Sequence, residues 1–151
     1  MDDPLTIPSV RVSRVNSMQI LRQIVQMTGS DSELVIFSYS VTDGWLRQLL
    51  KLRADMNICR ITLALDRDVM IRHREKLMQI QQVADEAYLM DSHAKLYLSR
   101  GKERTIAVIT SANATNNYRN ECYYATDRPA ELEQITRDIR TILDASERIV
   151  G

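Results

Sequence analysis

Cysteine is scarce in this sequence and long hydrophobic runs are absent, and each shortage excludes a class of protein. Cys59 and Cys122 are the only cysteines, which is too few for a disulfide framework, and they lack metal-ligand spacing. Both lie in apolar runs, so we expect buried thiols in a reducing compartment. No run reaches the roughly 18 apolar residues of a membrane span.

The N-terminus also lacks the features of a signal peptide. The segment MDDPLTIPSVRVSRV has acidic residues where a signal peptide has a basic start, and Pro4 and Pro8 interrupt what should be its apolar core. The sequence therefore predicts a cytoplasmic protein with no membrane partner.

An excess of one charge is missing as well, because 20 Lys and Arg balance 20 Asp and Glu. No global charge draws the chain to nucleic acid or to an anionic membrane, so any contact with a polyanion must be local. Residues 44–76 carry eight basic and four acidic side chains. This bias fits a mildly basic face or an ordinary solvated helix surface.

What the chain does have is enough apolar material for one core. With 151 residues, of which 44% are hydrophobic, the sequence predicts a single domain over residues 1–151. We find no internal repeat, low-complexity tract or linker.

Strand and helix patterns alternate along the chain. Apolar residues recur near a period of 3.6 from Asn16 to Thr28, and LVIFSYS is a short apolar, β-branched run. The alternation predicts an α/β layered domain with a mixed β-sheet flanked by helices. The expected helices are 16–28, 44–54, 67–85 and one from Pro129, and the expected strands are 34–40, 57–66, 86–90, 93–99, 104–110 and 121–126, with a hairpin turn at 100–103.

A group of polar residues lies in this strand-rich block. Period-two alternation puts His93 and Lys95 on one strand face, about 7 Å apart, where both can reach one anion. Pairing of the next strand would bring Ser111 and Asn113 to the same rim, and their side chains can bond phosphate oxygens. Glu121 could return a carboxylate to the imidazole and fix its tautomer. A nucleophilic histidine needs this set of groups.

The order His93-Ala94-Lys95, Ser111-Ala112-Asn113 and Glu121 resembles the H-x-K, S-x-N and trailing glutamate of the phospholipase D superfamily. The resemblance covers roughly Leu34 to Thr126 and implies a phospholipase D-like fold.

The resemblance also implies a role for each residue of this set. His93 would attack phosphorus to give a phosphohistidine, Lys95 and Asn113 would bind the non-bridging oxygens, Ser111 would support them, and Glu121 would orient His93. No metal or other cofactor would be required.

The superfamily uses two such motifs, and this chain has one. The other histidine, His73, lies in RHREK within an expected helix and is interpreted as a solvated residue. The resemblance therefore implies a homodimer in which two copies of His93 meet at a two-fold axis, as in compact single-motif nucleases. Two positions depart from the pattern: Arg100 replaces a frequent aspartate, and Thr110 replaces the usual glycine before the serine.

The sequence thus predicts a metal-independent phosphodiesterase, foremost a nuclease of low sequence specificity acting on nucleic acid such as DNA. Two alternatives stay open. One is a catalytically degenerate module that binds nucleic acid or another partner, and the other is a lipid phosphodiesterase.

Overall fold

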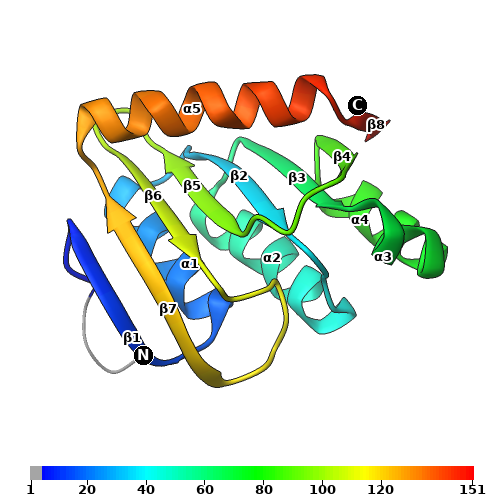
Figure 1. The fold of residues 1–151 in the computed structure, drawn as a ribbon, viewed down its shortest axis with the longest axis horizontal. Helices are drawn as coiled ribbons and strands as arrows, with labels where there is room; N and C mark the ends of the chain where they lie inside the picture. The colour runs from blue at the N-terminus through cyan, green and yellow to red at the C-terminus, as the bar shows by residue number, and fades with distance from the viewer. Residues whose placement is uncertain (1–4) are drawn as a thin grey trace.

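An eight-stranded mixed sheet is the central layer of the computed structural model, which describes residues 5–151 (Figure 1). Asp2, Asp3 and Pro4, on which the prediction about a signal peptide partly rests, lie outside the described residues. The elements are β1 Ser9–Val15, α1 Ser17–Thr28, β2 Glu33–Ser38, α2 Asp43–Met56, β3 Arg60–Asp66, α3 Arg67–Arg72, the 3₁₀ helix η1 Arg74–Lys76, α4 Leu77–Val83, β4 Glu86–Met90, β5 Leu96–Arg100, β6 Thr105–Thr110, β7 Arg119–Thr126, α5 Pro129–Asp144 and β8 Glu147–Val150.

The strand order is β1-β7-β6-β5-β2-β3-β4-β8. Strands β2, β3 and β4 are parallel, and every other neighbouring pair is antiparallel. The predicted fold class, a layered α/β domain with a mixed sheet flanked by helices, is confirmed. The predicted hairpin between β5 and β6 is also confirmed, with Arg100 opposite Thr105.

Each face of the sheet has its own apolar core. Helices α1, α2 and α4 pack on one face, where Trp45 is fully buried and its Nε1 donates to Ser17 Oγ at 3.0 Å. Helix α5 packs on the other face through Ile139 and its neighbours against Phe37 and Leu98. Trp45 is thus a packing residue, as predicted. No helix within residues 5–151 is long and apolar enough to cross a membrane.

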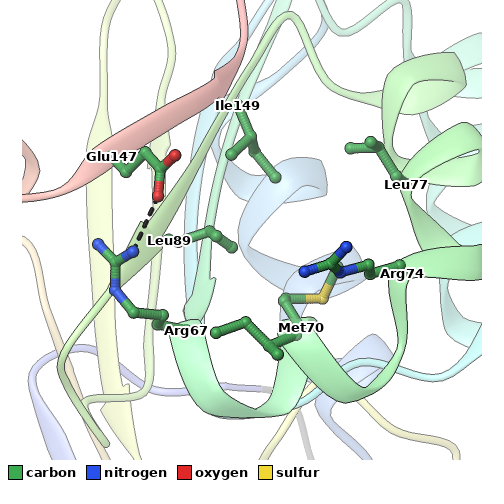
Figure 2. A pocket seen from close by; sticks show the side chains of 8 residues that line it. Arg67, Met70, Arg74, Leu77, Leu89, Glu147 and Ile149 are labelled. Atoms are coloured by element: carbon green, nitrogen blue, oxygen red, sulfur yellow. Dashed lines mark hydrogen bonds and ion pairs between the residues drawn. The ribbon is translucent and has the colours of Figure 1, made fainter.

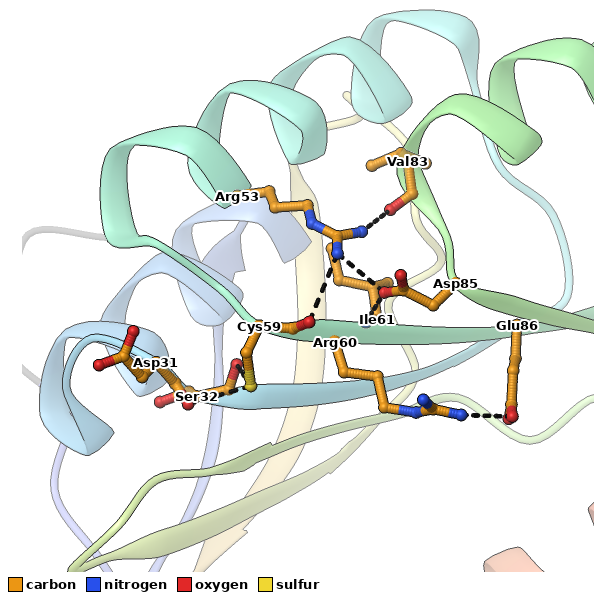
Figure 3. Close-up of polar contacts among 9 residues, drawn as sticks. All are labelled: Asp31, Ser32, Arg53, Cys59, Arg60, Ile61, Val83, Asp85 and Glu86. Carbon is orange, nitrogen blue, oxygen red and sulfur yellow. Dashed lines mark hydrogen bonds and ion pairs between the residues drawn. The ribbon is translucent and has the colours of Figure 1, made fainter. Parts of the chain in front are cut away.

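Helix α2 and the strand that follows it are held together by Arg53 (Figure 3). Its Nη1 donates to Val83 O at 2.7 Å, and its Nη2 lies 2.9 Å from Asp85 Oδ2. The same carboxylate oxygen accepts from Ile61 N at 2.8 Å. One guanidinium therefore fixes the end of α2 against β3 and the end of α4.

Strands β1 and β8 were not predicted. β1 is an edge strand that pairs only with β7, and its valines Val10 and Val12 are exposed, so its alternation does not mark a core face. β8 is four residues long and pairs with β4. Both strands depend on pairing with distant segments, which a local pattern does not reveal.

The single helix predicted over 67–85 is wrong, because the segment consists of α3, η1 and α4. His73 leaves the helical conformation, with φ −132° and ψ 48°. Between Ile71 and Leu77 the chain carries only charged residues and this histidine. The apolar stripe that would hold a continuous helix to the sheet is interrupted there.

The prediction that both cysteines are buried is also wrong, since both are exposed. Cys59 comes just before β3, and its thiol contacts Asp31 O at 3.2 Å. Cys122 is opposite Val12, in a part of the sheet with little cover. An apolar run was a poor guide to burial at these margins of the sheet.

Candidate active site

The five candidate residues gather at one end of the sheet, which we call the site end. Strand β5 is antiparallel to β2 and β6, so its first residue, Leu96, pairs with Phe37 and Ile109 near the ends of those strands. Ser111 N donates to Cys122 O at 3.1 Å, which brings the loop after β6 beside the start of β7. Three segments that are distant in sequence therefore meet in one place.

His93 and Lys95 lie in the loop before β5, not on the strand as predicted, because β5 begins at Leu96. His93 is exposed and Lys95 is half-buried. Lys95 Nζ donates to His93 O at 3.2 Å. The ammonium and the imidazole are thus neighbours at the surface, where both are accessible to an anion.

Asn113 is anchored by its side-chain oxygen. Its Oδ1 accepts from Tyr39 N at 3.1 Å, which ties the loop after β6 to the end of β2. Ala114 N donates to Ser38 Oγ at 2.8 Å and strengthens the same connection. The Asn113 amide nitrogen makes no hydrogen bond within residues 5–151, so it keeps its donors for a ligand.

Glu121 contacts Ser111 and not His93. A short hydrogen bond joins Ser111 Oγ to Glu121 Oε2, and Cys122 N donates to Ser111 Oγ at 3.1 Å. The ring of His93 instead contacts the ring of Tyr39, with centroids 4.5 Å apart. Among the contacts of the described residues, the expected bond from Glu121 to His93 is absent.

Tyr39 is a site residue that sequence reasoning missed. It follows β2 at the site end. Its ring contacts the ring of His93, and its backbone amide donates to Asn113 Oδ1. The available signal was the polar sequence Ser38-Tyr39-Ser40 at the end of an apolar strand. Such residues at the ends of central strands often face a ligand.

The buried side chain of Tyr97 holds the loop after β6 in place. Its hydroxyl donates to Ala112 O at 3.0 Å. Burial raises the pKa of Tyr97 well above its ordinary value, and the negative charge of Glu121 adds to the effect. The phenol therefore stays neutral and remains a donor at any physiological pH.

A cavity of about 310 Å³ opens beside this site. His93, Lys95 and Thr110 contribute polar groups to its wall, and α5 adds the carboxylate of Asp138. Phe37, Ile109 and the isoleucines of α5 make much of the rest apolar. The site thus has Lys95 on the rim of a hollow that is largely apolar and contains one carboxylate.

A larger hollow of about 360 Å³ lies between α3, η1, β4 and β8 (Figure 2). Arg67 on its wall has its Nη1 2.8 Å from Glu147 Oε2 and its Nε 3.5 Å from Asp91 Oδ1. Arg67 therefore links β8 to the segment that leads into His93. Within residues 5–151, no cluster of three or more His, Cys, Asp or Glu side chains could hold a metal ion.

Comparison with known proteins gives likenesses of structure only. No family model matches the chain, and no curated protein matches its sequence. The crystal structure of polyphosphate kinase from Porphyromonas gingivalis is similar, with a TM-score of 0.54 and 13% identity over 85% of this chain and 21% of that chain.

TrmBL2, described as an archaeal chromatin protein with a novel mode of DNA binding, has a TM-score of 0.56 and 13% identity over 91% of this chain and 53% of that chain. This chain therefore spans about a fifth of the first protein and about half of the second. At such low identity these likenesses support the fold class, a layered α/β domain with a mixed sheet, and establish neither a superfamily nor an activity.

Proposed function

We propose that this chain is a phospholipase D-like, metal-independent phosphodiesterase, foremost a nuclease of low sequence specificity that works as a homodimer in the cytoplasm. The observation that carries the proposal is the convergence of His93, Lys95, Ser111 and Asn113 at the site end. The likeness to TrmBL2 supports nucleic acid as the substrate.

The proposed reaction has two displacements at phosphorus. A ring nitrogen of His93 attacks, the bond to the leaving oxygen breaks, and the partner subunit's His93 protonates that oxygen. Water then attacks phosphorus and gives a proton to the partner subunit's His93, while the phosphorus–nitrogen bond breaks and restores the imidazole. Lys95 Nζ and the Asn113 amide stabilise the charge that builds on the non-bridging oxygens.

The surface that would bind the second copy continues from the site. Val10 and Val12 of β1 are 75% and 76% exposed, and Ile109 of β6 is 48% exposed. Ile109 and Val10 both pair with Tyr124, and Ile109 also lines the cavity beside His93. An apolar patch next to half of a two-histidine site is suited to a second copy of the same chain.

The decisive experiment is cleavage of plasmid and single-stranded DNA in the presence of EDTA. We expect cleavage to persist in EDTA and to be lost in His93→Ala, with a labelled phosphoprotein intermediate trapped from the parent protein. Loss of activity on chelation, or survival of activity in His93→Ala, would contradict the mechanism.

The dimer can be tested by introducing a charged side chain into the apolar patch of Val10, Val12 and Ile109. Val12→Glu should give a monomer in light scattering and remove cleavage, because a buried, unpaired carboxylate opposes association. Met78→Glu is the matched control, since Met78 on α4 is 72% exposed and lies outside the patch. A monomeric parent protein that cleaves DNA would contradict the proposed homodimeric active site.

One observation favours a second function, a module that binds nucleic acid without cleaving it. The Glu121 carboxylate bonds Ser111 and leaves His93 without the orienting partner that catalysis would use. Retention of DNA on a gel without cleavage, unchanged by Glu121→Ala, would support this alternative. A large loss of cleavage in Glu121→Ala would reject it.

A further inference from the structure

A cavity of about 450 Å³ lies where α1, α2 and the loop after β6 meet. Seven of its eight lining residues have polar side chains, and none of the eight is acidic. They are Asn16, Met18, Gln19, Arg22, Gln48, Lys51, Asn116 and Tyr118. A concave wall with two cations, several amides and no carboxylate is suited to a negatively charged ligand.

The two helices contribute matching pairs to this cleft. Gln19 and Arg22 are one turn apart on α1, and Gln48 and Lys51 are one turn apart on α2. Residues three apart lie on the same helix face, so each helix presents an amide followed by a cation. A ligand with evenly spaced anionic groups would match this repeated arrangement.

The two cations of the cleft differ from Arg53 of α2 and Arg60 of β3. Arg53 and Arg60 form ion pairs with Asp85 and Glu86. Arg22 and Lys51 are exposed and form no ion pair within residues 5–151. Their charges therefore remain available, whereas much of the basic bias of residues 44–76 is neutralised within the fold.

The remaining wall comes from the loop that also carries Ser111 and Asn113. Asn116 packs so closely on the start of α2 that a Cβ at Gly44 would collide with its side-chain amide. Asn16 Nδ2 donates to Asn117 O at 3.5 Å and adds a contact with α1. Tyr118, at the rim, is 43% exposed. The loop thus spans from the candidate active site to the cleft.

We infer that this cleft binds the phosphate backbone of a single-stranded nucleic acid, on the far side of the loop from the phosphodiester held at His93. Arg22 and Lys51 contact successive phosphates, and Tyr118 offers its ring to a base. The inference rests on the proposed function for the identity of the ligand. It adds a subsite that extends the substrate beyond the reacting bond.

The experiment measures binding in His93→Ala protein, so that cleavage does not interfere. Fluorescence anisotropy of labelled oligo-dT is compared between this protein and its Arg22→Glu/Lys51→Glu variant. Arg140→Glu/Lys102→Glu is the matched control, with the same residue types and charge change on α5 and the turn after β5. We expect the cleft variant to weaken binding at least about tenfold and to lower the slope of log affinity against log salt by about 1.4, the value for two phosphates on a single strand.

Inorganic polyphosphate, tested as an unlabelled competitor, separates a nucleic acid from a bare phosphate chain. Tyr118→Ala should weaken oligo-dT several-fold and leave competition by polyphosphate unchanged, since only the oligonucleotide has bases to stack. If Tyr118→Ala leaves oligo-dT binding unchanged, nucleic acid is the wrong occupant.

If the cleft variant binds oligo-dT as tightly as the His93→Ala protein, the cleft is not a binding site. An equal loss of affinity in the control variant would lead to the same conclusion. Absence of cleavage by the parent protein would instead overturn the proposed function, while the binding comparison still decides the subsite.

Discussion

Both ends of the sheet carry polar networks. The two networks differ in whether their hydrogen-bonding groups pair with one another, in which case we call the network closed, or keep unused donors, in which case we call it open. At the end opposite the site, which we call the far end, Thr28 Oγ1 lies 2.6 Å from Ser99 Oγ and 2.9 Å from Ser32 Oγ, all within the buried interior. At the site end, Lys95 and Asn113 keep donors that no group within residues 5–151 uses. Closed networks stabilise a fold, whereas open ones are available to a ligand.

The largest effect should follow from removing an open group. Lys95→Met should lower DNA cleavage by about 100- to 1,000-fold, because one charge-stabilising donor is lost. The unfolding midpoint should barely change, since His93 O is the only partner of Lys95 Nζ in the described part of the chain. Initial rates and thermal unfolding of the same preparation check both statements. A large fall in stability would mean that Lys95 belongs to the fold.

Asn113 both stabilises the fold through its side-chain oxygen and keeps amide donors for a ligand. Two substitutions can separate these roles. Asn113→Ala should cost about 1 kcal/mol of unfolding free energy, because Tyr39 N loses its acceptor, and should also lower cleavage. Asn113→Asp keeps an acceptor oxygen but removes the amide donors. Denaturant titration should therefore find Asp close to the parent protein, while the rate stays low. Full activity in Asn113→Asp would exclude a donor role.

A closed group should behave in the opposite way. Thr28→Val should cost about 1–3 kcal/mol, because the Ser99 hydroxyl is left buried with no partner at that position. Activity per folded molecule should equal that of the parent protein. Urea unfolding and active-site titration test this, and a selective loss of rate would break the contrast between the ends.

Substitutions of Tyr39 test whether the contact between its ring and that of His93 contributes to activity. Tyr39→Leu should lower cleavage by about two- to tenfold, the range expected for one aromatic contact. Tyr39→Phe keeps the ring and should behave like the parent protein. Equal initial rates in all three proteins would show that the ring contact has no part in the chemistry.

The smallest effect concerns acid at the far end. Glu131 accepts from Thr126 Oγ1 and from the Tyr124 hydroxyl, and these bonds lower the pKa of its carboxyl. A lowered folded-state pKa gives stability that is present at neutral pH and is lost as the pH falls through that pKa. Glu131→Gln should therefore lower the melting temperature slightly at pH 7, and this difference should disappear on acidification. A difference that persists in acid would assign the effect to packing.

Local patterns predicted most of the fold. The apolar periodicity of 16–28 and the apolar run of 34–40 encode α1 and β2 within a few residues, and the structure has both elements. Strands β1 and β8 depend on distant partners, so no local pattern revealed them. The break at His73 follows instead from the local run of charged residues between Ile71 and Leu77, which the helix prediction did not take into account.

The site was predicted as a set of residues and not as a geometry. His93, Lys95, Ser111, Asn113 and Glu121 do gather at one sheet end, yet strand alternation wrongly extended β5 back to His93. The partner of Glu121 also differs from the expectation. Side-chain choice at an exposed rim depends on neighbours such as Tyr39, which the spacing of a motif does not include.

The pairing of β1 with β7 has a consequence for the order in which the protein is assembled. Ser13 is opposite Glu121 in this pair, more than one hundred residues away along the chain. β1 is synthesised before β7 and can pair with it only after the intervening residues have been made. Contacts at such separation are expected to form late. The rim that contains Glu121 would then be among the last parts of the molecule to close, so a newly made chain acquires its candidate site only when folding is nearly complete.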